Sequence, residues 1–191
     1  MVFRVIGIGV CITAIMPPGT LDSRAKVCPG CNMSERIVGI DPGAKGALAL
    51  FEGGELVRIA DMPTVEHKGR PRVDAASVAV LLRSLAPSVA YVERVGAMPG
   101  QGVTSMFTFG FAAGIIWGAL AGLMIPVTAI TAAQWKVALH VPKEKSGARA
   151  RASQLLPSGA QWWPMARHEG RAEAALIGLY GLRESKRAIA W

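Results

Sequence analysis

The chain has 191 residues, of which 51% are hydrophobic, and its formal net charge is +8. This length allows a single domain with a core of its own, and the lack of a fixed-period repeat excludes a solenoid. Of the 21 basic residues, 10 lie in Lys136–Trp191, together with only 4 of the 13 acidic residues. Such an asymmetry indicates a polyanionic partner, with nucleic acid favoured over a membrane surface. A basic domain without such a partner is the alternative.

The first 32 residues differ in composition from the rest of the chain. Val5–Met16 is apolar and Arg4 precedes it, which weakly resembles a secretory signal without a clear small-residue cleavage site. Met33 would make a natural start. We therefore expect residues 1–32 to be an extension that contributes little to the fold, with the domain at residues 33–191. A targeting peptide is the alternative. Cys28 and Cys31 have the spacing of a zinc knuckle, but no second pair follows nearby, so zinc is not expected.

The stretch Arg36–Phe51 predicts a strand, a turn and a second strand. Its first apolar run suits a buried central strand, and Pro42, Gly43 and Gly46 are turn residues. Asp41 ends the first strand, where an unpaired buried charge would be costly. A divalent metal, a phosphate-binding turn or a simple turn cap would each explain this carboxylate, and the stretch alone does not choose among them.

The segment that follows predicts further strands and one helix. We expect a strand at Glu55–Asp61, a basic loop at His67–Arg72, a helix at Val73–Leu85, a buried strand at Val89–Val95 and a flexible loop at Gly96–Gly102. Glu93 lies in the second of these strands, so a second acid comes from a buried strand.

Val103–Leu123 is the longest apolar run, and glycine recurs in it at every fourth position from Gly110 to Gly122. Its length and its small residues would suit a membrane span. Because the run begins with polar residues and lies between two strand patterns, we interpret it instead as a buried helix whose small residues pack closely on the sheet or on a partner.

The C-terminal part predicts one strand and three helices. They are a strand at Pro126–Ile130, a short helix at Thr131–Leu139, a basic helix at Lys143–Leu156 and a last helix at His168–Leu182, with a loop at Pro157–Pro164. The basic helix carries Lys143, Lys145, Arg149 and Arg151, which we expect to contact a nucleic-acid backbone. A helix that faces solvent is the alternative.

Four acids form a pattern along the chain. Asp41 and Glu93 lie on strands, and Glu169 and Glu173 share one face of the last helix. Divalent ions take carboxylate oxygens, and two such ions can activate a water and stabilise a leaving oxygen in phosphodiester cleavage. The helical pair alone would be explained equally by an exposed face neutralised by Arg167 and Arg171.

Four stretches together resemble a known family. They are IVGIDPGAKGALALF at 37–51, YVERVGAMPGQGVTSMFTFG at 91–110, TAAQWK at 131–136 and HEGRAEAALIGLYG at 168–181. In this order they resemble the RuvC-like Holliday junction resolvases of phages and prophages, within the ribonuclease H-like superfamily. The resemblance implies an α/β fold with a mixed five-stranded sheet flanked by helices. It also implies a homodimer that makes paired nicks across a four-way DNA junction, using two Mg²⁺ or Mn²⁺ ions.

The resemblance assigns roles to individual residues. Asp41, Glu93 and Glu173 match metal ligands of the family. The better-known members carry their third acid at the position of Gly170, so here Glu169 or His168 should supply it, and helical geometry favours Glu169. His168 would otherwise orient the water or contact the leaving phosphate. Lys136 matches a basic residue thought to stabilise charge on the scissile phosphate.

The loop after Glu93 departs from the family, because it lacks the aromatic residue that enters the junction centre. Met98 is the bulky apolar side chain available there, either as a DNA wedge or as a residue that packs down. The alternative functions are an ATP-dependent phosphotransferase of the actin-like fold, a non-catalytic junction-binding protein and a small membrane protein built on Val103–Leu123. The resolvase interpretation predicts a cytoplasmic protein with no membrane association.

Overall fold

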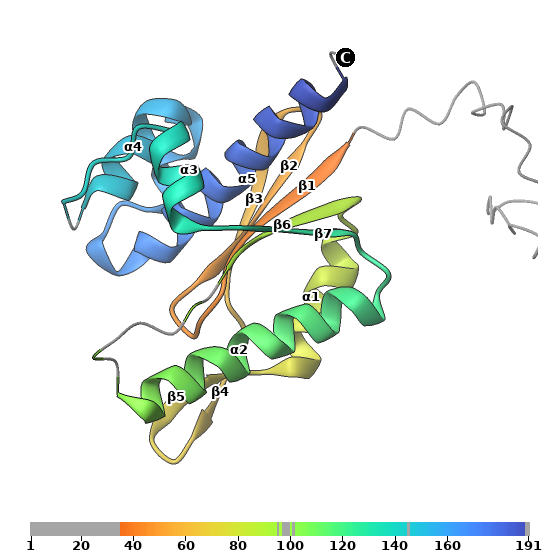
Figure 1. Ribbon diagram of the computed structural model, residues 1–191, viewed down its shortest axis with the longest axis vertical. Coiled ribbons are helices and arrows are strands. Elements are labelled where there is room, and N and C mark those ends of the chain that lie inside the picture. Colours follow the sequence, from red (N-terminus) through yellow and green to blue (C-terminus); the bar gives the residue numbers. More distant parts are fainter. Residues whose placement is uncertain (1–34, 95, 97–99, 101, 145, 190–191) are drawn as a thin grey trace, which may run out of the picture. The chain divides into compact units, whose positions relative to one another are not determined.

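The computed structural model describes residues 35–189 except 95, 97–99, 101 and 145. The expectations for residues 1–32 therefore lie outside the described residues. Five strands form one mixed sheet in the order β3-β2-β1-β6-β7 (Figure 1). Their bounds are β1 Arg36–Asp41, β2 Ala47–Glu52, β3 Glu55–Asp61, β6 Val89–Glu93 and β7 Val127–Ile130. The five predicted strands are thus confirmed, as is the mixed α/β fold class.

The sheet combines an antiparallel half with a parallel half. β2 pairs antiparallel with both β1 and β3, as expected for consecutive hairpins. β6 pairs parallel with β1 and with β7, which requires crossover connections through helices. Because β1 is central and buried, its sequence is apolar on both faces up to Asp41.

Helices cover the two faces of the sheet separately (Figure 1). Their bounds are α1 Ala75–Leu85, α2 Val103–Gly122, α3 Ala132–Ala138, α4 Gly147–Leu155 and α5 Glu169–Ile189. Ile37 and Phe51 pack in one core with α3, α4 and α5, whereas Val38 and Ile40 pack in the other with α1 and α2. The alternation of side chains along a strand produces this division.

Two helices begin at side-chain caps. The Asp74 carboxylate accepts a hydrogen bond from the Ser77 N–H at 3.1 Å and starts α1. Thr131 and Gln134 form a reciprocal capping box that starts α3 directly after β7. Local sequence therefore fixes where α3 leaves the sheet, and with it the position of Lys136.

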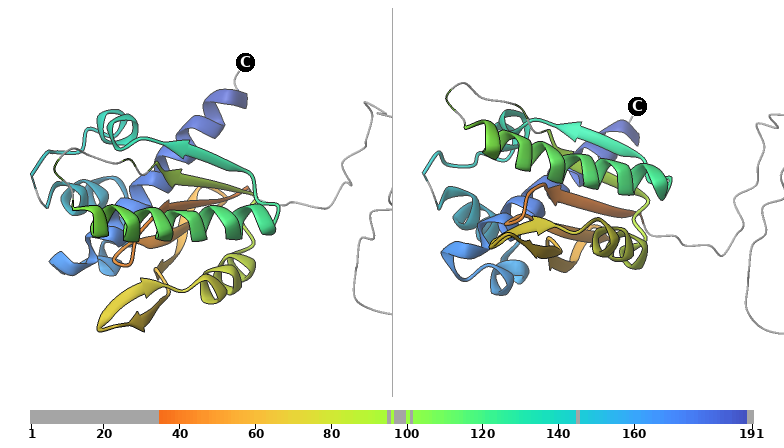
Figure 2. Two further views of the ribbon diagram at one scale, coloured as in Figure 1. Left: turned by 60° about the horizontal axis from the view of Figure 1, so that its bottom comes forward. Right: turned by 90° about the horizontal axis from the view of Figure 1, so that it is seen from below.

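The predicted basic loop at His67–Arg72 is wrong. The chain forms a second, two-stranded sheet there, with β4 at Thr64–His67 and β5 at Arg70–Val73. Lys68 and Gly69 join the strands with φ angles of 50° and 74°, as a two-residue hairpin turn requires. The hairpin lies beside the N-terminal half of α2 (Figure 2).

Two further predictions need correction. The basic helix begins at Gly147 rather than Lys143, so Lys143 precedes α4. The long apolar helix α2 is present, but only Ala112, Ile116 and Leu120 of it are buried. Its glycines do not approach the sheet, since a Cβ added at Gly110, Gly114, Gly118 or Gly122 would meet nothing within 4 Å. α2 has the length and hydropathy of a membrane-crossing helix, a property that core helices of water-soluble proteins share.

Candidate active site at the carboxyl end of the sheet

The register of the parallel strands places Asp41 beside Glu93. β1 and β6 pair Ile40 with Val92, so the next residue of each strand stands at the same edge of the sheet. Ile40 and Val92 face the core beneath α1 and α2. Because side chains alternate along a strand, Asp41 and Glu93 face the opposite side, toward α5.

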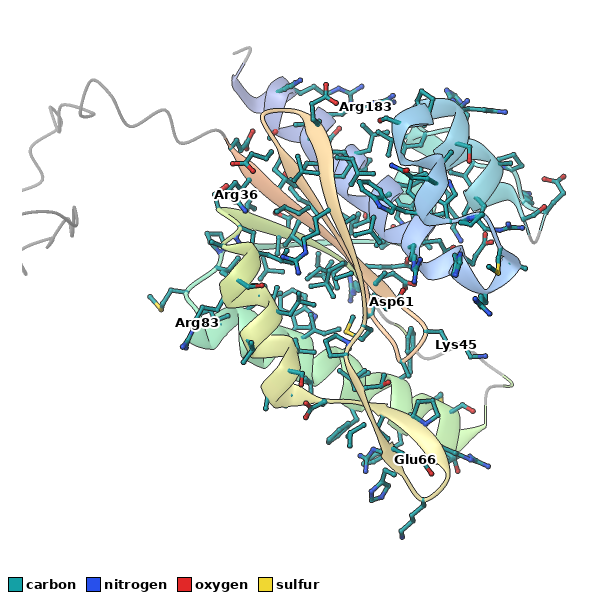
Figure 3. The ribbon with its side chains drawn as sticks, turned by 180° about the vertical axis from the view of Figure 1, so that it is seen from behind. Arg36, Lys45, Asp61, Glu66, Arg83 and Arg183 are labelled. Carbon is teal, nitrogen blue, oxygen red and sulfur yellow. The ribbon has the colours of Figure 1, made fainter. Side chains whose placement is uncertain are left out.

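Helix α5 approaches the end of β1 at a glycine. A Cβ added at Gly170 would lie 2.3 Å from the Lys45 carbonyl oxygen and 3.0 Å from Asp41 Oδ2. Figure 3 shows Lys45 on the turn between β1 and β2. The close approach leaves no room for a side chain at residue 170, so an acid at that position is excluded by sterics. Glu173, three residues further along α5, then becomes the helix's acid nearest the two strand carboxylates.

The three carboxylates repel one another. Desolvation raises the pKa of Asp41 well above its ordinary value of 3.8, and the charges of Glu173 and Glu93 raise it further. Desolvation also raises the pKa of Glu93, and the charge of Glu173 adds to this. The nearby Lys136 ammonium acts in the opposite direction on both groups. The site thus concentrates more negative charge than its own cation neutralises.

Lys136 reaches this group of acids from α3. Its Nζ lies 3.3 Å from Glu173 Oε1, and its side chain is 43% exposed, so the ammonium faces open solvent on one side. A cleft of about 760 Å³ is lined by Lys136, Glu173 and Glu169 among others. An anionic group that enters this cleft would meet the Lys136 ammonium.

Trp135 was not among the predicted site residues. It is fully buried, and its indole N–H has no hydrogen-bond partner among the described residues. The indole nevertheless lies close enough to lower the pKa of Glu93 by favouring its charged form. Its place in the stretch TAAQWK, next to Lys136, is the signal that could have identified it.

Glu169 has a different partner. Its Oε2 accepts a hydrogen bond from Arg149 Nε at 3.0 Å, which ties the start of α5 to α4. Glu169 lines the same cleft as Glu173, but its carboxylate is engaged by the guanidinium. No local pattern predicts an ion pair between residues this far apart in sequence.

His168 is directed elsewhere. Its ring lies beside the Met165 N–H and the Arg167 guanidinium. Desolvation lowers its pKa, and the charges of Arg171 and Arg167 lower it further. None of the contacts described for His168 joins it to Asp41, Glu93 or Glu173.

A neighbouring ion pair anchors β3 to α5. Arg171 donates to both carboxylate oxygens of Asp61, at 2.6 and 2.5 Å, and to the Trp162 carbonyl at 2.9 Å. These hydrogen bonds lower the pKa of Asp61. Arg171 therefore holds the end of the sheet against the start of α5, rather than neutralising Glu169 as the sequence alternative supposed.

The residues predicted to bind DNA do not form one free surface. Met98 and Lys145 lie outside the described residues. Lys143 is exposed and lines the cleft. Arg149 pairs with Glu169, and Arg151 Nε donates to the Leu139 carbonyl at 2.6 Å. Two of the four basic residues thus make contacts within the molecule.

The donor set suits a hard divalent cation, although its spacing is too wide. Three carboxylates gather at the carboxyl end of the sheet, and the charge of Glu173 raises the pKa of Asp41 and of Glu93, a repulsion that a bound cation would relieve. Within the described part of the chain, however, no group of three or more His, Cys, Asp or Glu side chains is spaced to hold a metal ion. The carboxylates would therefore have to move together, and Glu173 away from Lys136, on binding.

Comparison with known proteins bears on the fold. No protein-family model matches the sequence, and no curated protein does. Among solved structures, RuvC of Thermus thermophilus in complex with a Holliday junction substrate matches with a TM-score of 0.58 and 20% identity, over 80% of this chain and 96% of that one. A second structure of Thermus thermophilus RuvC gives a TM-score of 0.55 at 20% identity, with the same coverage.

A third similar structure is the yeast mitochondrial Holliday junction resolvase Ydc2. Its TM-score is 0.53 at 14% identity, over 82% of this chain and 83% of that one. These similarities show that the chain has the RuvC-like form of the ribonuclease H-like α/β fold, as its resemblance to the resolvases predicted.

Proposed function

We propose that this protein is a metal-dependent endonuclease that resolves four-way DNA junctions by paired phosphodiester cleavage. The observation that carries the proposal is the convergence of Asp41, Glu93 and Glu173, with Lys136, at the carboxyl end of a RuvC-like sheet. Support also comes from the junction complex of the Thermus thermophilus protein, whose fold this chain shares. We expect the protein to act in the cytoplasm.

The carboxylates would hold the metal ions. Asp41, Glu93 and Glu173 are the ligands that we propose for Mg²⁺ or Mn²⁺, with Glu169 as a further ligand for a second ion once Arg149 releases it. When bound, such ions activate a water molecule and stabilise the charge of the leaving oxygen. The pKa of Asp41 and of Glu93 is raised first by desolvation and then by the charge of Glu173, and bound cations would offset both effects by favouring the charged carboxylates.

The remaining residues would bind and orient the DNA. Lys136 stands at the cleft and would neutralise charge on the scissile phosphate when Glu173 no longer holds its ammonium. Lys143 lines the same cleft and would contact a neighbouring phosphate. His168 keeps a proposed role in contacting the leaving phosphate, which would require it to turn from Arg167.

Paired cleavage implies two active sites. A four-way junction has two-fold symmetry, so two copies of the chain related by a two-fold axis would cut opposing strands. We propose that the exposed side of α2 contributes to that dimer contact. The glycines there leave space for a partner, and Trp117, which does not line the groove beside β4 and β5, is 39% exposed.

One experiment tests the proposal and its alternatives. Wild-type protein, Asp41→Asn and Glu93→Gln are incubated with four-way, Y-shaped and linear DNA, with and without Mg²⁺. We expect Mg²⁺-dependent cleavage of the four-way junction by the wild type. Each variant should lose at least about a thousandfold in rate, because metal ions supply several kcal/mol of transition-state stabilisation. Junction binding should persist.

Glu55→Gln is the matched control, because Glu55 is an exposed acid at the opposite end of the sheet. It should cleave at the wild-type rate. Cleavage by Asp41→Asn at near that rate would refute the assignment. Tight junction binding by a wild type that never cleaves would favour a non-catalytic binding protein, and junction-independent ATP hydrolysis would favour the actin-like phosphotransferase.

A further inference from the structure

A second hollow lies beside the candidate active site. It has a volume of about 820 Å³ and is lined by residues of the β4–β5 hairpin and of the N-terminal half of α2. We call it the hairpin groove. The side chains that define its chemistry are Lys68, Arg70, Arg72, Phe107, Phe109 and Phe111.

The aromatic content of the hairpin groove is unusual for a protein surface. Three of the five phenylalanines of the chain line it. Phe107 is 70% exposed, Phe109 38% and Phe111 43%. Exposed apolar groups gathered in one place mark a binding site more often than a free surface. These rings are thus available to a ligand with flat apolar faces.

The other wall of the groove is positively charged. Lys68, Arg70 and Arg72 come from the hairpin, with His67 beside them, and no acidic side chain is among the described residues that line the groove. The Arg72 guanidinium lies 4.4 Å from the centre of the Phe111 ring. Glu66 also belongs to the hairpin, as Figure 3 shows, but it does not line the groove.

The hairpin groove adjoins the acidic site. Gly43 and Ala44, which follow Asp41 in the turn after β1, line the groove, and the Phe109 ring lies 3.2 Å from where a Cβ of Gly43 would stand. The Met62 N–H donates to the Gly46 carbonyl at 3.0 Å and joins the base of the hairpin to the same turn. A strand seated in the groove would therefore lead to the proposed cleavage site.

We propose that the hairpin groove binds unpaired nucleotides of a DNA strand. Bases would stack on Phe107 and its neighbouring rings, while Lys68, Arg70 and Arg72 would contact phosphates. Aromatic platforms beside a basic wall are the general chemistry by which proteins hold single strands. The proposal rests on the proposed function only in taking DNA as the substrate.

A second copy of the chain is a less suitable occupant of the groove. A two-fold contact would place the same surface on both sides. The positive wall formed by Lys68, Arg70 and Arg72 would then face its own copy, without acids in the groove to neutralise it. Charge complementarity therefore favours a polyanion.

The test measures binding without cleavage, in the Asp41→Asn background and without divalent metal. The probes are a labelled single-stranded oligonucleotide and a duplex of the same length. Phe107→Leu should weaken single-strand binding about tenfold, since one base–aromatic stack is lost, and change duplex binding less than about twofold. Val80→Ala is the control, because Val80 is 70% exposed on α1 outside the groove, and it should change neither.

A second variant tests the basic wall. Arg70→Gln, in the exposed hairpin, should weaken single-strand binding and reduce its salt slope by about 0.7, as expected for one phosphate contact. Arg83→Gln is the control; Figure 3 shows Arg83 on α1, away from the hairpin, and its loss should leave the slope unchanged. Thermal unfolding establishes that each variant is folded.

Several results would overturn the proposal. One is an unchanged single-strand affinity in both Phe107→Leu and Arg70→Gln. Another is an equal loss of affinity for duplex and for single strand in Phe107→Leu. The third is a dimer that dissociates in Phe107→Leu while DNA binding stays intact. The binding assay needs neither metal nor cleavage. If the wild type failed to cut junctions, the proposed function would be rejected, and the binding assay would still decide whether the hairpin groove holds single strands.

Discussion

The carboxyl group of Asp41 lies where its charge is disfavoured. Desolvation and the neighbouring Glu173 and Glu93 raise its pKa well above 3.8, and Lys136 offsets only part of this. A folded-state pKa above the unfolded value means that the native protein binds more protons between the two values. The free energy of unfolding therefore decreases as pH rises through that window.

We accordingly predict that Asp41→Asn stabilises the metal-free protein at pH 7 and flattens the fall of its stability above pH 4. Asparagine has no charge to desolvate, and its presence also removes repulsion from Glu93. Urea unfolding at several pH values in a chelator measures this. Glu55→Gln should leave the profile unchanged, and an Asp41→Asn protein less stable than wild type at pH 7 would contradict the electrostatic account.

The strand acids could be predicted from sequence, whereas their partners could not. Asp41 and Glu93 end apolar runs, so a local pattern identifies both as carboxylates at a sheet edge. The pairing of Arg149 with Glu169 depends on how α4 packs against α5. Spacing along one helix contains no information about contacts made by another element.

At the scale of elements, α5 is the helix that brings the acids together. Its small residues Gly170, Ala174 and Gly178 recur about one turn apart and lie against β1. A Cβ added to Gly39 of β1 would lie 2.2 Å from the Gly178 nitrogen and 2.3 Å from the Ala174 carbonyl oxygen. A Cβ on Gly178 would lie 2.6 Å from the Phe51 ring. This contact positions Glu173 over the end of β1.

We predict that Gly178→Ala destabilises the protein by about 1–3 kcal/mol, the usual cost of overpacking a core. Gly114→Ala on α2 is the matched control, because nothing lies within 4 Å of its Cβ. Replacing that helical glycine should stabilise the monomer by about 0.5–1 kcal/mol. Denaturant unfolding distinguishes the two, and a Gly178→Ala protein as stable as wild type would show that α5 can move away from the sheet.

Long apolar elements were predicted well, and short polar ones were not. The five strands of the main sheet and α2 follow from apolar runs of adequate length. The sequence pattern does not predict the β4–β5 hairpin, because all four residues of β4 are exposed and form no buried face. The burial of α2 was overestimated because hydropathy does not tell an intramolecular partner from an intermolecular one.

At the scale of the whole molecule, α2 shows that the described chain leaves a large apolar surface uncovered. At 100° per residue, Gly110, Gly114, Gly118 and Trp117 share a side of α2 opposite Ala112 and Ile116. The latter two residues are buried, while Trp117 is 39% exposed. A second molecule that covers this side would complete the proposed paired active sites.

We predict a two-fold dimer in solution at micromolar concentration and its dissociation by Trp117→Glu, because an uncompensated charge in an apolar contact is costly. Light scattering measures the mass. Val80→Glu places the same charge on the exposed side of α1 and should leave the dimer intact. A wild type that is monomeric even with junction DNA present would contradict the expectation.

The hairpin that forms one wall of the groove enters and leaves the fold at nearly one point. The Asp74 N–H donates to the Pro63 carbonyl at 3.0 Å, so a backbone hydrogen bond joins the two chain segments that flank the hairpin. Apart from Val73, which is buried in the core beneath α1 and α2, the hairpin is consequently an appendage of the fold. Evolution or engineering can lengthen, recharge or exchange it without changing the strand order or moving Asp41, so the surface beside the acidic site can diversify while the site itself is inherited intact.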